Sequence, residues 1–179
     1  MIDGDEDLVF FKTIFRQSSV SMRLEHYEVK VSPQEFTFEF QSEGPKGRVR
    51  KVVQFTPLAG DSLFNLGFGD HSEKTDDFDD MSITNNGDTE KVLATVAFIV
   101  YVFSEQFPDA WIYASGSTQA RNRLYRMGIN RHFNTMSADF EILGRSQGTW
   151  ELYRRGSNYD AFVVRQKRFR FEKCSERSN

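Results

Sequence analysis

The sequence is poor in the residues that build disulfide and metal sites. Its single cysteine, Cys174, among 179 residues cannot form a disulfide within the chain or supply a multi-cysteine zinc site. The three histidines, His26, His71 and His132, are far apart in the sequence, and none belongs to an H-x-x-x-H pair of the kind found in zinc enzymes. We therefore expect neither a metal centre nor a cofactor.

Targeting segments and long apolar runs are also missing. No charged start is followed by an apolar stretch and a small-residue cleavage site, so the sequence predicts no signal peptide. The longest apolar stretch, residues 92–103, is about eight residues too short to span a bilayer. These absences predict a soluble, cytoplasmic protein that does not interact with membranes.

Phenylalanine, in contrast, is abundant, with 18 copies in a chain that is 39% hydrophobic and 27% charged. This composition excludes a wholly disordered chain, and the length suits one domain with a sizeable core. We predict a single domain over residues 25–166, an N-terminal extension over residues 1–24, and a basic, flexible tail over residues 167–179.

The formal net charge of −3 hides a division of charge along the chain. Residues 1–90 sum to −9 and residues 91–179 to +6. Such a division can orient a charged partner, although two solvated surfaces explain it equally well. The acidic segment at 70–80 lacks the D-x-[DN]-x-[DN]-G pattern of a calcium loop, so we expect it to be mobile and to bind no metal tightly.

The periodicity of the apolar residues predicts an α+β domain. Alternation with a period of two indicates strands near residues 27–31, 36–40, 49–55 and 64–68, joined by short turns as an antiparallel meander. An α-β-α-β succession follows: a helix over 89–107 with Asp88 as N-cap, a strand over 111–114, a helix from the 116–118 turn to about His132, and a strand over 140–144. Weaker strands are expected over 149–153 and 161–166. We predict that the two helices pack on one face of a mostly antiparallel sheet.

The helix over 89–107 is apolar on almost every side, as in a helix that is buried all round. One sheet face covers only part of such a helix. The sequence therefore predicts a homodimer or a small protein partner that covers the rest.

The segment most suggestive of a binding site is residues 111–126, where a strand enters a Gly116-Ser117-Thr118 turn and a helix leaves it. Free N–H groups and a partial positive charge at a helix N-terminus favour anions, and nearby hydroxyls and arginines add to that preference. We predict an anion site made of Ser117, Thr118, Arg121, Arg123 and Tyr125, with Asp70 in its second shell. The segment matches neither the P-loop nor the dinucleotide-binding fingerprint.

A helical wheel places Ala120, Leu124 and Met127 on one face, which we expect to be the core face, and Arg121 with Tyr125 on its flank. Two structural alternatives remain: Ser117 or Thr118 is only an N-cap, or Arg121 forms an ion pair with Asp70 that holds the fold together. Serine nucleophile chemistry is disfavoured, because His132 lies about 22 Å from Ser117 along the same helix.

Four motifs give the chain a family resemblance: GPKG at 44–47, NLGFGD at 65–70, NNGD at 85–88 with KVLATV at 91–96, and GSTxxRxRLYRMGI at 116–129. With this ordered set, over about residues 25–144, the chain resembles a family of small uncharacterised bacterial proteins, mainly from Bacteroidetes, with a domain of unknown function. The resemblance implies kinship and no established activity, and it hints at a toxin–antitoxin or defence-related role.

Three functions remain open. The residues favour a binding module that recognises an anionic partner, such as nucleic acid or a nucleotide phosphate, or a protein, through residues 116–126. A toxin-like enzyme directed at RNA, acting through arginines and hydroxyls, is the second. A structural homodimer without a ligand is the third. The sequence favours binding over catalysis and identifies no catalytic residue.

Overall fold

The structure is a computed structural model and describes residues 25–32, 36–72, 77–79 and 84–167. The predicted N-terminal extension, all but the first residue of the predicted tail, and much of the acidic segment lie outside the described residues. The helices and strands follow one another as β1 (Val29–Ser32), β2 (Thr37–Gly44), β3 (Gly47–Ala59), β4 (Leu63–Ser72), β5 (Asp77–Asp79), α2 (Thr89–Gln106), β6 (Trp111–Ala114), α3 (Gln119–Asp139), β7 (Phe140–Ser146), β8 (Thr149–Leu152) and β9 (Ala161–Gln166).

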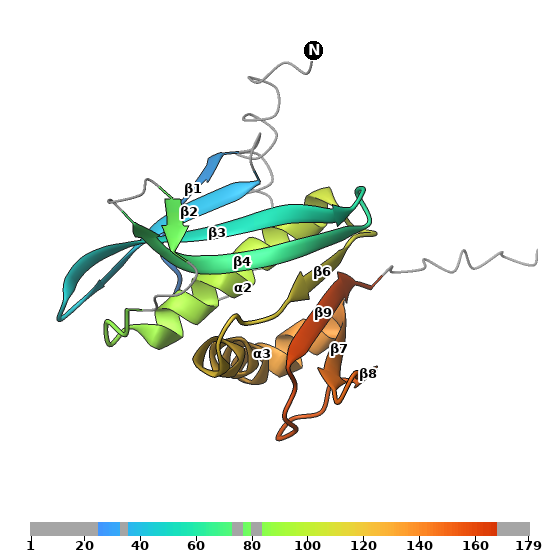
Figure 1. The fold of residues 1–179 in the computed structure, drawn as a ribbon. Coiled ribbons are helices and arrows are strands. Elements are labelled where there is room, and N and C mark those ends of the chain that lie inside the picture. The colour runs from blue at the N-terminus through green and yellow to red at the C-terminus, as the bar shows by residue number, and fades with distance from the viewer. Residues whose placement is uncertain (1–24, 33–35, 73–76, 80–83, 168–179) are drawn as a thin grey trace, which may run out of the picture.

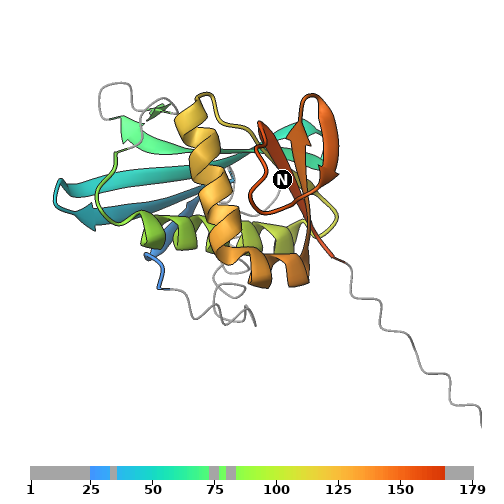
Figure 2. The same ribbon diagram turned by 90° about the horizontal axis from the view of Figure 1, so that it is seen from below.

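All the described strands belong to one sheet. Strands β1 to β4 form the predicted antiparallel meander, and the sheet continues in the order β4-β6-β9-β7-β8, with β5 paired to the end of β4. Among the described strand pairs, only β4–β6 is parallel. Both helices lie on the same face of the sheet, and seen from below α3 crosses α2 (Figures 1 and 2). The predicted α+β class and this arrangement of helices and sheet are confirmed.

The core is aromatic because the period-two phenylalanines of the meander all point toward α2. Strand register aligns Phe38 with Val53 and Val53 with Phe68, so inward side chains of three strands form one row. From α2, Phe103 stacks on Phe55 with ring centroids 3.8 Å apart. Aromatic contacts in such a core add to the stabilisation from apolar burial.

Helix α2 is buried along almost its whole length, from Val92 to Ser104, within the single chain. The sheet covers one side of it, and α3 covers another, where Leu93 approaches Gly128 and an ideal Cβ on that glycine would lie 3.3 Å from Leu93 Cδ2. The apolar surface of α2 is therefore covered without a second subunit, and the homodimer stays a prediction.

Several bounds differ from those expected from the sequence. Helix α3 runs on to Asp139, beyond the predicted end near His132, because Met136 continues its buried side. Strands β3 and β4 are longer than predicted, since the hairpin between them pairs almost to its tip. No helix among the described residues is both long and apolar enough to cross a membrane.

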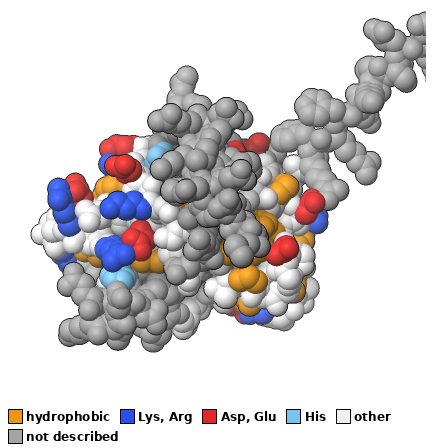
Figure 3. All heavy atoms as spheres, turned by 90° about the horizontal axis from the view of Figure 1, so that it is seen from above, with side chains coloured by type: hydrophobic (Ala, Val, Ile, Leu, Met, Phe, Trp, Pro, Cys, Tyr) orange, Lys and Arg blue, Asp and Glu red, His pale blue; other side chains and the backbone are white. Residues whose placement is uncertain are grey.

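The division of charge along the sequence is partly neutralised by folding. Lys91 pairs with Glu25 and Arg131 with Glu90, so that bases of the second half meet acids of the first. On the sheet face opposite the helices, basic and acidic side chains are interspersed (Figure 3). Exposed pairs such as these contribute little stability.

Candidate functional site

The turn between β6 and α3 is folded tightly against the first turn of the helix. An ideal Cβ on Gly116 would lie 2.5 Å from the backbone nitrogen of Asn122 and 2.8 Å from Cβ of Arg121. The N–H of Gly116 donates to Oδ1 of Asn122 at 2.7 Å. Only glycine allows this approach, which fixes the direction in which α3 starts.

Thr118 is the N-cap of α3. Its backbone is extended, and its Oγ1 accepts a hydrogen bond from the N–H of Arg121 at 3.3 Å. Its carbonyl accepts from the N–H of Asn122 at 3.1 Å. The capping alternative therefore describes Thr118, while Ser117 is exposed beside it.

Arg121 is the least expected residue of the element, because its side chain is only 2% exposed. Within the described part of the chain, neither Nε nor Nη2 of its guanidinium has a hydrogen-bond partner. Buried polar atoms are nearly always hydrogen-bonded, and a buried charge without a partner is costly. Arg121 is thus a buried cation, and two of its guanidinium nitrogens have no partner among the residues that the structure describes.

Asp70 does not supply that counter-ion. It lies opposite Lys51 in the β3–β4 register, and Lys51 Nζ donates to its Oδ1 at 2.5 Å. Its Oδ2 accepts from the N–H of Thr84 at 2.8 Å. The ion pair between Asp70 and Arg121 that the sequence allowed is therefore replaced by one between Asp70 and Lys51.

Tyr125 lies one turn beyond Arg121 on the buried side of α3. It is 9% exposed, and its hydroxyl lies 3.4 Å from the carbonyl oxygen of Leu66, to which it donates. It also lines an apolar cavity of about 70 Å³ between the helices and the sheet. Tyr125 thus shares a side of the helix with Arg121, as predicted, but this side is interior.

The expected core face of α3 was wrong for Ala120 and Met127, whereas Leu124 is partly buried and packs against the core. Its buried residues are Arg121, Tyr125, Ile129, His132 and Met136. Met127, which the wheel assigned to the core, is 43% exposed, and Ala120 is exposed. The helical wheel assigned the core face from apolar residues near the start of the helix. The side that packs against the sheet is instead the row of buried residues that extends from Arg121 to Met136.

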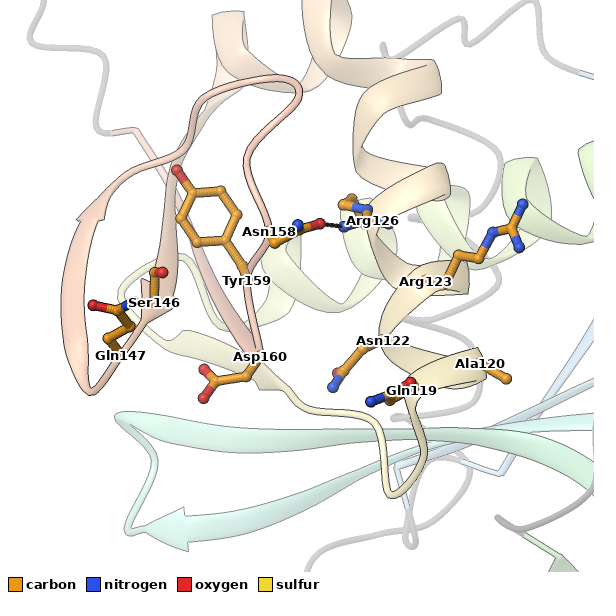
Figure 4. Close-up of a pocket in the computed structure, with 10 residues that line it drawn as sticks. All are labelled: Gln119, Ala120, Asn122, Arg123, Arg126, Ser146, Gln147, Asn158, Tyr159 and Asp160. Carbon is orange, nitrogen blue, oxygen red and sulfur yellow. Dashed lines mark hydrogen bonds between the residues drawn. The ribbon is translucent and has the colours of Figure 1, made fainter.

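Arg123 lies on the opposite, outer side of α3, at a polar cleft of about 640 Å³. The cleft separates the helix from the β7–β8 turn and the loop before β9 (Figure 4). Its lining consists mostly of polar side chains: Gln119, Ala120, Asn122, Arg123, Arg126, Ser146, Gln147, Asn158, Tyr159 and Asp160. The predicted site residues are therefore divided between an interior side, with Arg121 and Tyr125, and an outer side, with Arg123.

Two contacts shape this cleft. Arg126 Nη1 donates to Oδ1 of Asn158 across it, and Arg145 Nε donates to Oδ1 of Asp160 at 2.9 Å. Sequence reasoning missed Asn158 and Asp160, because they precede a short strand in a loop of ordinary turn composition. Nothing local in the sequence indicates that β9 inserts beside β6 and carries this loop to α3.

A second polar cluster lies at the start of α2. Asp88 is the N-cap residue there, as predicted, but its side chain makes no capping hydrogen bond. Its Oδ2 instead accepts from the hydroxyls of Ser42 at 2.6 Å and Tyr27 at 2.8 Å. The carboxylate thereby ties β2 and the β1 side of the sheet to the helix start.

Asn86 fixes the β2–β3 hairpin to the same place. Its Oδ1 accepts from the N–H of Lys46 and its Nδ2 donates to the carbonyl of Gly47, each at 2.9 Å. An ideal Cβ on Gly44 would lie 1.8 Å from the carbonyl oxygen of Asn86. The GPKG and NNGD motifs of the sequence thus contact each other and hold the β2–β3 hairpin against the start of α2.

Metal ligation has no obvious place among these groups. Across the residues that the structure describes, no three His, Cys, Asp or Glu side chains gather as a metal site would require. Much of the acidic segment over 70–80 lies outside that set.

Comparison with known proteins identifies the family of the chain and no function. Neither the curated proteins nor the solved structures gave a match. A family model, described as a family of unknown function (DUF6934), matches residues 23–167. This match covers every strand and both helices described above, and the chain therefore belongs to the DUF6934 family.

Proposed function

We propose that this protein is a binding module that recognises an anionic partner, such as nucleic acid or a nucleotide phosphate, through residues 116–126. The observation that carries the proposal is the buried Arg121 guanidinium, 2% exposed, whose Nε and Nη2 have no partner among the described residues. A guanidinium stays charged at every physiological pH, so it cannot relieve the cost of burial by losing its proton. An incoming anion would relieve that cost.

The surroundings of Arg121 favour an anion over a neutral ligand. The residue lies in the first turn of α3, where the helix dipole places partial positive charge. A guanidinium offers a planar fork of donors that fits two oxygens of a phosphate or carboxylate. In an interior shielded from water, such a charge-assisted pair is stronger than at the surface. Gly116 and the Thr118 cap hold the turn rigid, which lowers the entropic cost of binding.

The proposal is tested by thermal unfolding of the full chain with inorganic pyrophosphate and, separately, with a short single-stranded RNA. A ligand that binds only the folded state raises the melting temperature in proportion to RT ln(1 + [L]/Kd). We expect at least one of these anions to raise it for the wild type. Arg121→Met, which keeps the volume and removes the charge, should lose that response.

Arg131→Met is the matched control, because Arg131 lies on the same helix but is exposed and paired with Glu90. It should respond to the anion as the wild type does. An equal response of Arg121→Met would show that the anion binds elsewhere. The absence of any response to both anions would contradict the proposal itself.

A further inference from the structure

The polar cleft on the outer side of α3 carries an inference that does not depend on Arg121. Its helix wall presents hydrogen-bond donors. The Oδ1 atom of Asn122 is occupied by the N–H of Gly116, which can only donate, so the amide nitrogen of Asn122 is the end left for the cleft. Arg126 uses Nη1 on Asn158 and retains further N–H groups on its planar fork.

The opposite wall presents an acceptor. Asp160 is exposed, and its Oδ1 accepts from Arg145 at 2.9 Å, which fixes the orientation of the carboxylate. A carboxylate has about four acceptor positions, so this contact leaves the group able to accept from a ligand. In Figure 4 the side chains of Gln119 and Asn122 extend toward Asp160 from across the cleft.

A ligand that fits both walls has acceptors on one edge and donors on the neighbouring edge. Guanine has this pattern, with acceptors O6 and N7 beside the donors N1–H and N2–H₂. Arginine and amide side chains pair with base acceptors such as O6 and N7, and a carboxylate accepts from two adjacent N–H groups. Adenine has one exocyclic donor and uracil a single ring donor, so each satisfies the carboxylate less well.

We propose that this cleft is a binding site for a guanine base, with Asp160 accepting from its N1–H and N2–H₂ edge and Arg126 donating to O6 and N7. The volume of about 640 Å³ is that of a site for a small organic ligand. Arg126 and Asp160 come from different elements, so the site is complete only when the loop before β9 lies against α3.

The probe is guanosine, which carries no phosphate, titrated into the full chain by calorimetry. We expect a dissociation constant below about 1 mM. Asp160→Asn and Arg126→Gln should each weaken binding by about ten-fold or more, since each removes one side of a paired edge. Arg131→Gln, on the same helix outside the cleft, should bind guanosine as the wild type does, and so should Arg121→Met.

Adenosine and uridine serve as competitors of the same size class. Weaker binding of both is expected, and equal binding of the three nucleosides would overturn the assignment to guanine. Guanosine affinity unchanged in both Asp160→Asn and Arg126→Gln would place the ligand outside this cleft. No detectable guanosine binding would reject the proposal while leaving the pyrophosphate and RNA results intact.

Discussion

Among the described residues, the lysine and the arginine that are buried, Lys51 and Arg121, differ in what surrounds them. Lys51 is 1% exposed and Arg121 is 2% exposed. Lys51 donates to Asp70 at 2.5 Å and to the carbonyl of Thr84 at 3.3 Å. Arg121 has two guanidinium nitrogens without a partner among the described residues. The described residues pair the charge of Lys51 and leave two donors of Arg121 without a partner.

The difference shows how a buried charge can be either structural or available to a ligand. Lys51 and Asp70 are partners in strand register, so forming the hairpin also forms the pair. The remaining oxygen of Asp70 is taken by Thr84, which closes the network. Once satisfied in this way, the pair has little left to offer a ligand. Arg121 lies on a helix, and the register of the described strands brings no acid to its Nε and Nη2.

The largest expected effect is the loss of the Lys51 pair. Lys51→Met leaves the Asp70 carboxylate buried without its cation, and we expect the free energy of unfolding to fall by about 3–5 kcal/mol. Urea denaturation measures this directly. The double variant Lys51→Met/Asp70→Leu should recover much of the loss, because it removes both charges. A loss below about 1 kcal/mol for Lys51→Met would mean that the pair is hydrated.

The sequence predicted Asp70 as a neighbour of Arg121, although the alternation in β3 held a signal for Lys51. Lys51 lies on the same side of the strand as Val49, Val53 and Phe55, the side that the period of two assigns to the core. A lysine in that position needs an acid on a neighbouring strand. The chain order of strands and helices could be predicted from such alternation, because one-sided burial imposes the period of two. The insertion of β9 between β6 and β7 could not, because strand order depends on long-range packing.

The candidate site was only partly accessible to sequence reasoning for the same reason. The Gly116 turn and the Thr118 cap are local, and both are visible in the sequence. Tertiary packing determines which side of α3 faces the sheet. That side carries a charged residue, Arg121, where an apolar one is usual. Asp160 reaches the outer cleft only through the long-range placement of β9. Local chemistry could therefore be predicted, whereas the division into two sides could not.

The next largest effect concerns the turn that positions Arg121. Gly116→Ala would force a Cβ to within 2.5 Å of the Asn122 nitrogen, so the start of α3 must shift. Backbone adjustment of this kind costs about 1–3 kcal/mol, and we expect it to weaken anion binding as well. Gly128→Ala is the control, because its Cβ meets only the end of the Leu93 side chain at 3.3 Å. A Gly116→Ala variant as stable as the wild type would show that the turn adapts freely.

A smaller effect of opposite sign is expected for Arg121 without ligand. Replacing a buried charge that lacks a partner by an apolar side chain of similar size is neutral or stabilising. We expect Arg121→Met to raise the free energy of unfolding by about 1 kcal/mol in anion-free buffer. Urea denaturation beside Lys51→Met makes the comparison direct. A fall of about 3 kcal/mol would instead show that Arg121 is paired within the fold and acts as a second structural clasp.

The smallest effect concerns His132, the other buried basic residue of α3. Burial lowers its pKa from the ordinary value, and the nearby charge of Arg131 lowers it further, while Glu90 opposes them. Between the lowered pKa and the ordinary histidine value the unfolded chain binds more protons, so stability must fall as the pH drops below about 6.5. We expect His132→Leu to flatten that fall between about pH 7.5 and pH 5 in urea titrations, because Nε2 has no partner to lose within the described structure. An unchanged slope in His132→Leu would mean that His132 is hydrated in the folded protein. Of the two buried basic residues of α3, Arg121 would then be the one that is shielded from solvent.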